Sequence, residues 1–167
     1  MTEHIRALRI DELDFISALA LRSKGYWGYS QDFLDACKDE LSITSGQFYN
    51  PKFYFRVIEQ ETTIIGYYAI YCLDSTTYEL DALFVEPEYI GQGIGKKLID
   101  DAKTLVMQLG GTKIMLQAEP NAEPFYLKVG AKVVGKKESQ SITGRYLSML
   151  EIDLGVKHVA YKAAQVR

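Results

Sequence analysis

The sequence contains few of the residues that build metal centres, disulfides or nucleophilic relays. Of its 167 residues, two are cysteine and two are histidine, and the histidines, His4 and His158, lie near the two ends. Cys37 and Cys72 are far apart and have apolar neighbours, which favours two small buried side chains over a disulfide or a metal clip. We therefore expect no metal and no Ser-His or Cys-His relay.

The chain also lacks an excess of positive charge and a long apolar run. Its net charge of −3 and pI near 5.5 argue against nucleic-acid binding, because no basic surplus is available to displace counterions from phosphates. No run approaches the roughly 20 apolar residues of a membrane span, and residues 1–6 are charged where a signal peptide would be apolar. We expect a cytoplasmic protein with no nucleic-acid and no membrane partner.

The chain does have enough apolar residues for one core. With 47% apolar and 25% charged content, 167 residues suffice for one domain and are too few for two. We expect a single domain over 1–167, with a core at about 4–154 and a C-terminal tail at 155–167. The tail alternates small apolar and basic residues, which fits either a short helix or a frayed end.

The spacing of apolar residues predicts an α+β fold. Helical spacing indicates one helix from Asp11 to about Gly25, one capped by Ser30, one from Ile94 to Leu109, and a short one that starts at Asn121 or at Glu119-Pro120 and is ended by Gly130. The order of elements around 77–117 predicts a strand-helix-strand crossover, and the runs from 53 to 85 predict an antiparallel meander. Runs rich in β-branched and aromatic residues indicate strands at 4–10, 53–59, 63–73, 77–85, 113–117, 132–137 and 145–154.

Three alternate glycines, Gly91, Gly93 and Gly95, lie between the strand at 77–85 and the helix that follows. Glycines in such a turn let the backbone approach an anion with its N–H groups directed outward. The first turn of the helix adds unpaired donors and the positive end of the helix dipole, and Lys96 adds a formal charge. The turn therefore predicts a phosphate site.

Two common phosphate loops do not fit this turn. A nucleotide P-loop requires Ser or Thr after Gly-Lys, and here Lys97 follows Gly95-Lys96, so no hydroxyl is available for magnesium. A dinucleotide fingerprint has the spacing Gly-x-Gly-x-x-Gly and an apolar strand before it, whereas this strand carries Glu79 and Asp81.

Two stretches instead resemble the GNAT N-acetyltransferase superfamily. The segment Leu83-Phe-Val-Glu-Pro-Glu-Tyr-Ile-Gly-Gln-Gly-Ile-Gly-Lys-Lys-Leu98 is similar to its acetyl-CoA-binding signature. The segment Asn121-Ala-Glu-Pro-Phe-Tyr-Leu-Lys-Val-Gly-Ala131 is similar to its downstream helix, in which an Asn contacts coenzyme A and a Tyr lies near the sulfur. The resemblance covers roughly 4–154. It implies a mixed, mostly antiparallel sheet of about seven strands, about four flanking helices, and a splayed pair of parallel strands that holds the cofactor.

The sequence departs from the family pattern at two positions. Ile90 stands where the family usually has Arg or Gln, three residues before the central glycine, and lacks a polar contact to the pyrophosphate. Either cofactor affinity is lower or Gln92, Lys96 and Lys97 compensate. Ala131 replaces a frequent aromatic residue, which we interpret as a packing difference.

The resemblance also implies how acetyl-CoA is bound and used. An acceptor amine attacks the thioester directly, and Tyr126 protonates the departing thiolate, although a core tyrosine beside Phe125 is the alternative. Asn121 binds coenzyme A, caps a helix, or does both. The turn residues hold the pyrophosphate through their N–H groups, unless they form an ordinary tight turn. The expected cofactor contacts come from Leu83, Phe84, Val85, Gly91, Gln92, Gly93, Ile94, Gly95, Lys96, Asn121 and Tyr126.

The acceptor must lose a proton before it attacks, which requires a carboxylate or a chain of waters. Glu79 and Asp81 share one face of their strand, and either could be the base, although strand carboxylates also protect sheet edges from aggregation. Tyr26, Trp27 and Tyr29 form an aromatic loop that either lines the acceptor pocket or staples two helices together. Arg145 pairs either with an acceptor carboxylate or in a surface salt bridge.

The sequence therefore predicts an acetyl-CoA-dependent N-acetyltransferase that acts on a small amine or a peptide amino group. A non-catalytic acyl-CoA sensor and a transferase of a longer acyl group are the alternatives. The final strand and the tail are available for a second subunit, so a homodimer stays open.

Overall fold

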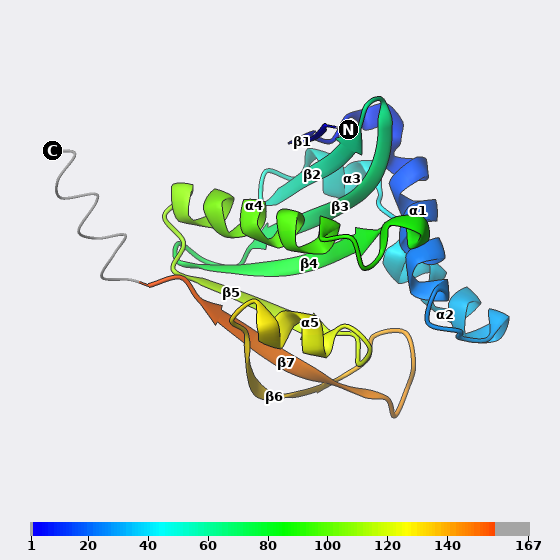
Figure 1. Cartoon of the computed structure of the whole chain (residues 1–167). Helices are drawn as coiled ribbons and strands as arrows, with labels where there is room; N and C mark the ends of the chain where they lie inside the picture. The colour runs from blue at the N-terminus through cyan, green and yellow to red at the C-terminus, as the bar shows by residue number, and fades with distance from the viewer. Residues whose placement is uncertain (1, 156–167) are drawn as a thin grey trace, which may run out of the picture.

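A seven-stranded sheet organises residues 2–155, which are the residues that the computed structural model describes (Figure 1). The strand order is β1-β2-β3-β4-β5-β7-β6, and every neighbouring pair is antiparallel except β4 and β5. The predicted mixed, mostly antiparallel sheet is confirmed. Beyond residue 155, the expected tail lies outside the described residues. The strands are β1 (Glu3–Ala7), β2 (Phe53–Gln60), β3 (Thr63–Cys72), β4 (Thr77–Val85), β5 (Lys113–Ala118), β6 (Lys132–Glu138) and β7 (Tyr146–Asp153).

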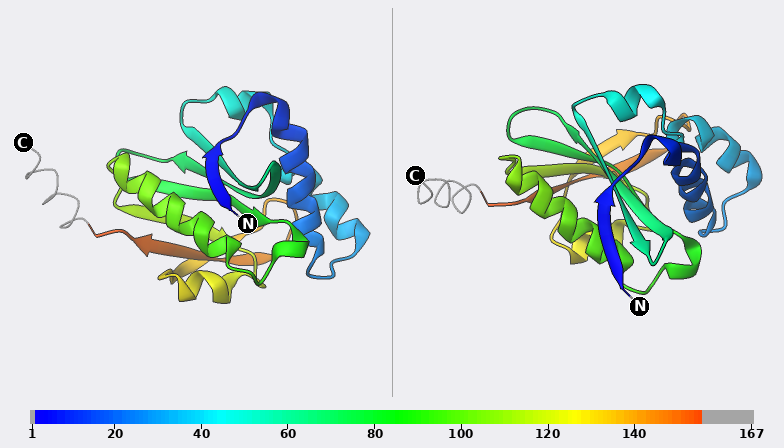
Figure 2. Two further views of the ribbon diagram at one scale, coloured as in Figure 1. Left: turned by 45° about the horizontal axis from the view of Figure 1, so that its top comes forward. Right: turned by 90° about the horizontal axis from the view of Figure 1, so that it is seen from above.

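Helices cover both faces of the sheet (Figure 2). Helices α4 and α5 lie on one face and α1 and α2 on the other, while the short α3 packs against β2. The helices are α1 (Leu13–Gly25), α2 (Gln31–Leu41), α3 (Ser45–Tyr49), α4 (Ile94–Gln108) and α5 (Glu123–Lys128), with 3-10 turns η1 (Ile10–Glu12) and η2 (Pro87–Tyr89).

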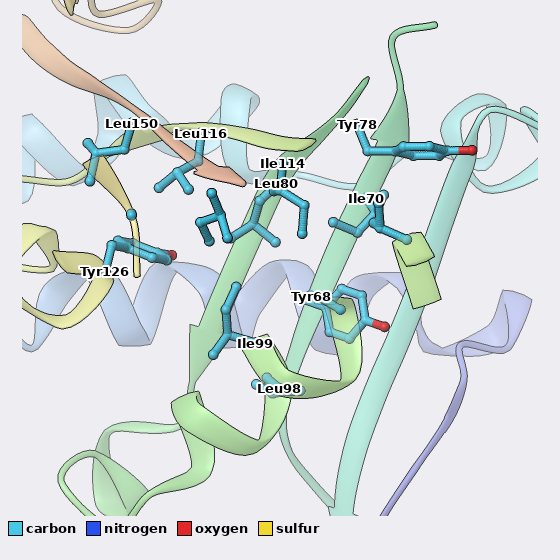
Figure 3. Packing of buried hydrophobic residues seen from close by; sticks show 14 of the residues in the cluster. Tyr68, Ile70, Tyr78, Leu80, Leu98, Ile99, Ile114, Leu116, Tyr126 and Leu150 are labelled. Carbon is cyan, nitrogen blue, oxygen red and sulfur yellow. The ribbon is translucent and has the colours of Figure 1, made fainter. Parts of the chain in front are cut away.

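Each face has its own buried core. On the α4 side, residues of the helix pack against β3, β4 and β5, and Tyr126 of α5 joins the same cluster (Figure 3). On the α1 side, Ile16, Leu19 and Ala20 are fully buried against β2 and β3. Fully burying one such aliphatic side chain contributes about 1.5–3 kcal/mol, so the two cores supply most of the driving force.

The structure corrects two predicted boundaries and adds one helix. The first strand ends at Ala7 rather than at Ile10, because Leu8 turns into the core and the Arg9 N–H donates to Glu12 Oε1 (2.8 Å), which starts η1. Helix α5 begins at Glu123, with Ala122 as its N-cap. Sequence reasoning missed α3, which a capping box between Thr44 and Gln47 starts.

Gly111, just after α4, tests the packing of the α4-side core. A Cβ there would lie 2.3 Å from Val106 Cγ1 and 2.8 Å from the ring of Tyr78. We expect Gly111→Ala to lower the free energy of unfolding by about 2–3 kcal/mol, measured by urea denaturation, because overpacking costs of that order. Gly135→Ala in β6 is the control, since nothing would lie within 4 Å of the added Cβ. Equal effects at the two positions would contradict this packing.

Candidate active site

The parallel strands β4 and β5 are paired over only part of their length. Three residue pairs join them, the last being Glu79 with Met115, although β4 continues to Val85 and β5 to Ala118. Beyond Glu79 the two strands separate (Figure 1). The expected splay is confirmed, and it leaves backbone groups of β4 around Leu83, Phe84 and Val85 without a β5 partner. A strand edge of this kind can hydrogen-bond an extended ligand that carries amides.

The glycine turn lies between this open part of β4 and helix α4. Gly91 and Gly93 adopt φ values of +84° and +85°, which residues with a Cβ rarely adopt. Gly93 is the N-cap of α4, no side chain of the described residues caps the helix, and the N–H of Lys97 is the first to bond back, to Gly93 O (3.2 Å). The N–H groups of Ile94, Gly95 and Lys96 thus remain available to an anion.

Gly95 is required for a different reason from the other two glycines. It lies within α4, and a Cβ on it would come 3.3 Å from Phe125 Cζ on α5. The third glycine therefore permits close packing between the two motif helices rather than a left-handed turn. The first and second motif segments meet at this contact.

Most side chains around the turn are engaged by other groups of the protein, which limits what remains for an anion. Ile90 is half-buried and packs against the α4-side core, so it contributes to packing. Lys97 pairs with Glu3 of β1 (2.9 Å), and Gln92 Nε2 donates to Glu88 O (2.9 Å). Lys96 remains beside the turn, exposed and paired with Asp100 (2.7 Å). Anion binding here would rest on backbone N–H groups and Lys96.

Tyr126 lies in the α4-side core and is only 7% exposed. Its ring contacts Phe125 edge-on at 5.1 Å between centroids. In Figure 3 its hydroxyl is directed toward the part of the cluster that contains Leu80, on the unpaired half of β4. Burial raises the pKa of Tyr126, so its phenol stays protonated and can act as a proton donor.

A β-bulge in β4 lies at Asp81, one of the two candidate bases. The register with β3 steps from Ala69–Ala82 to Ile70–Leu80, which leaves Asp81 as the extra residue. Leu80 belongs to the α4-side core and Ala82 to the α1-side core, so the alternation of side chains is reset at Asp81, which lies on the α1 side with Ala82. Glu79 lies on the same side, between two residues that face α4. The structure thus brings both carboxylates to the face opposite α4.

Asp81 has the most perturbed carboxyl group on this face. Its side chain reaches solvent, but protein surrounds the carboxyl closely, and this desolvation, with the charges of Glu79 and Glu40, raises the pKa of Asp81 to about 6. Nearby, the Tyr67 hydroxyl is fully buried and has no hydrogen-bond partner among the described residues. Burial and the charge of Asp81 raise the pKa of Tyr67. Sequence reasoning missed Tyr67 and Glu40, since nothing in their local sequence marks them.

Tyr29, Asn121 and Arg145 come together around Glu119, which sequence reasoning treated only as a helix start. Tyr29 donates a hydrogen bond to Glu119, Asn121 Nδ2 donates to Glu119 Oε1 (3.0 Å), and Arg145 Nη2 donates to Glu119 Oε2 (3.1 Å). Although burial opposes ionisation, the hydrogen bonds from Tyr29 and Arg145 lower the pKa of Glu119. In the sequence, only the position of Glu119 two residues before Asn121 of the second motif marked it as a candidate site residue. Arg145 therefore forms an internal, half-buried salt bridge.

The predicted aromatic loop divides into two parts. Tyr29 stacks on Phe33 of α2 (4.1 Å between centroids) and joins the polar cluster. Tyr26 and Trp27 contact each other at 5.0 Å and remain 49% and 42% exposed. They are thus open to an acceptor, whereas Tyr29 is already engaged.

The part of the chain that the structure describes holds no group of three or more His, Cys, Asp or Glu side chains placed for a metal ion. No helix within residues 2–155 is long and apolar enough to span a membrane.

The splayed strands, the glycine turn at a helix N-terminus and the buried tyrosine define an acetyltransferase of the GNAT class. A family model described as acetyltransferase (GNAT) domain matches residues 25–149, and the chain belongs to this family. It is an acetyl-CoA-dependent N-acetyltransferase, as the motifs predict.

Individual relatives agree with this assignment. The peptidyl-lysine N-acetyltransferase YjaB of Salmonella typhimurium is 30% identical over 147 residues, which span 87% of this chain and 94% of the relative. Among solved structures, PaiA N-acetyltransferase of Thermoplasma acidophilum in complex with coenzyme A has a TM-score of 0.74 at 22% identity, covering 92% and 99% of the two chains. An aminoglycoside 6′-N-acetyltransferase complexed with coenzyme A has a TM-score of 0.69 at 18% identity, covering 91% and 97%.

The raised pKa of Asp81 predicts a pH-dependent gain in stability on substitution. A folded-state pKa of about 6 against an ordinary 3.8 means that ionising Asp81 costs the folded state, so its contribution to stability falls as pH rises through this window. We expect Asp81→Asn to raise the Tm at pH 7 by about 2 °C, a small shift because the group reaches solvent. At pH 3.5 the two proteins should melt together. A lower Tm at pH 7 would show that the carboxylate stabilises the fold.

Proposed function

We propose that this enzyme acetylates the side-chain amino group of lysine in peptides or proteins, with Asp81 as the general base and Tyr126 as the general acid. The observation that carries the proposal is the pair of carboxylates, Glu79 and Asp81, on the α1 side of β4 where β4 leaves β5. A lysine acceptor arrives as an ammonium, and neighbouring carboxylates attract that charge. The printed name of the 30% identical relative, a peptidyl-lysine N-acetyltransferase, supports the same class of acceptor.

The cofactor would lie between β4 and β5. Its pyrophosphate would take the N–H groups of the turn and the start of α4, with Lys96 adding charge. Its pantetheine arm would pair with β4 at Leu83, Phe84 and Val85, in the way that an added strand pairs. The acetyl group would then lie near the bulge, between Asp81 on one face and Tyr126 on the other.

The reaction needs a base for the acceptor ammonium and an acid for the departing thiolate, and the two candidate residues suit these roles. With a pKa of about 6, Asp81 is mostly ionised at neutral pH and can take the proton from the acceptor ammonium, directly or through water. The free amine attacks the acetyl carbonyl carbon, and the C–S bond of the resulting tetrahedral intermediate breaks. The protonated Tyr126 then donates its proton to the departing thiolate, and the second proton of the attacking nitrogen passes to the Tyr126 phenolate or to water, which gives the acetylated amine and coenzyme A.

Exposed Tyr26 and Trp27 suit an acceptor that is a peptide. Their rings lie on the loop after α1 and can pack against the apolar stem of lysine or against neighbouring side chains. Tyr26 and Trp27 would then contribute to the affinity for the acceptor rather than to the chemical step.

A thiol-release assay over a panel of amines tests the acceptor class. We expect the highest kcat/KM for a peptide that contains lysine and has a blocked N-terminus, at least about tenfold above a lysine-free peptide with a free N-terminus and above polyamines. The same peptide with acetyl-lysine is the blank, and Tyr126→Phe should slow release by about 10². A preference for the free N-terminus or for a polyamine would refute the lysine assignment.

The pH profile tests the base. We expect kcat/KM for the acceptor to rise with pH through an apparent pKa of about 6, the value at which Asp81 ionises. In Asp81→Asn this limb should disappear and kcat should fall by about 10²–10⁴. Glu79→Gln serves as the matched variant and should keep the limb. A limb that persists in Asp81→Asn and vanishes in Glu79→Gln would assign the base to Glu79.

A further inference from the structure

Tyr29, Glu119, Asn121 and Arg145 form a closed hydrogen-bond network, called here the Tyr29 network. The Tyr29 hydroxyl donates to Glu119 and accepts from Asn121 Nδ2 (3.1 Å) and Arg145 Nη2 (3.3 Å), so its donor and both lone pairs are used. The Arg145 guanidinium also lies 4.9 Å from the centroid of the Phe33 ring, which fixes it from a second side. The network therefore holds each of these side chains by more than one contact.

This network determines which way the Asn121 amide points. The two groups that face it, the Glu119 carboxylate and the Tyr29 oxygen whose proton is engaged, can only accept hydrogen bonds. Asn121 must therefore present its NH₂ group to them, since a flipped amide would place its oxygen against a carboxylate. The amide oxygen, Oδ1, is left directed away from the network, and no group among residues 2–155 donates a hydrogen bond to it.

The network lies where three connections meet at the open end of the splay. Glu119 and Asn121 directly follow β5, Arg145 directly precedes β7, and Tyr29 lies on the connection between α1 and α2. These connections are on the same side of the molecule in Figure 1. The hydrogen bonds to Glu119 thus link the connection between α1 and α2 to the end of β5, the strand that borders the proposed cofactor site.

We propose that Tyr29 and Glu119 are positioning residues for the cofactor: they hold the Asn121 amide so that its oxygen accepts an N–H from the pantetheine arm of acetyl-CoA. The inference rests on the proposed site of the cofactor between β4 and β5. It assigns Tyr29 to cofactor affinity, although its place in the aromatic loop suggests the acceptor.

Calorimetric titration of coenzyme A tests this role without any acceptor. We expect Tyr29→Phe and Asn121→Ala each to raise the Kd by about tenfold, which is the size of one lost hydrogen bond. The double variant should bind about as weakly as Asn121→Ala alone, because Tyr29 acts only through the amide. The isosteric Glu119→Gln, which can donate to the amide and let it flip, should also weaken binding. Tyr49→Phe, at an exposed tyrosine of α3, should not change the Kd.

A second ligand separates positioning from damage to the fold. We expect 3′-phospho-ADP, which keeps the pyrophosphate but lacks the pantetheine arm, to bind wild type, Tyr29→Phe and Asn121→Ala equally. An unchanged Kd for coenzyme A in Tyr29→Phe, an additive double variant, or an equal loss for 3′-phospho-ADP would overturn the proposal. These titrations do not involve the acceptor. If the enzyme binds coenzyme A as expected but does not acetylate lysine peptides, the proposed acceptor is wrong and the role of Tyr29 and Glu119 is unaffected.

Discussion

The early end of the pairing between β4 and β5 is the constraint on which the rest of the site depends. Three residue pairs hold the strands together, and the other six of the nine β4 residues have backbone groups that no β5 residue satisfies. An open edge inside a sheet is costly unless something fills it, because unpaired amides lose water without gaining a partner. The cofactor is the natural occupant, since its arm is extended and carries amides. The glycine turn, α4 and Tyr126 are all arranged around this opening.

Strand β4 also separates the two halves of the chemistry. Asp81 lies on the α1 side, and the bulge there reverses the alternation of side chains, so that Leu80 before it and Val85 after it both remain in the core under α4. The proposed base and the proposed acid thus act from opposite faces of one strand. Desolvation makes Asp81 a usable base near neutral pH and at the same time costs stability, a common compromise at active sites.

Much of the fold could be predicted from the sequence because its signals are local. Alternating apolar residues and the glycine turn define β4 and α4, and a helix N-terminus binds anions wherever it occurs. The Tyr29 network could not be predicted, because its members come from segments up to 116 residues apart, and only the folded sheet brings them together. The bulge at Asp81 was also hidden, since period-2 spacing places Glu79 and Asp81 on one face with or without it. From the sequence, Ile90 indicated only a lost polar contact to the pyrophosphate, and its packing against the α4-side core explains why the residue is apolar.

Amide hydrogen exchange with and without saturating coenzyme A tests most directly whether the opening between β4 and β5 holds the cofactor. We expect slower exchange for the amides of β4 between Leu80 and Val85 that face β5, and for those of Ile94, Gly95 and Lys96. The β1–β2 pair, at the far edge of the sheet, should be unaffected. Unchanged exchange in β4, with protection gained elsewhere in the chain, would show that the cofactor does not bind in this opening.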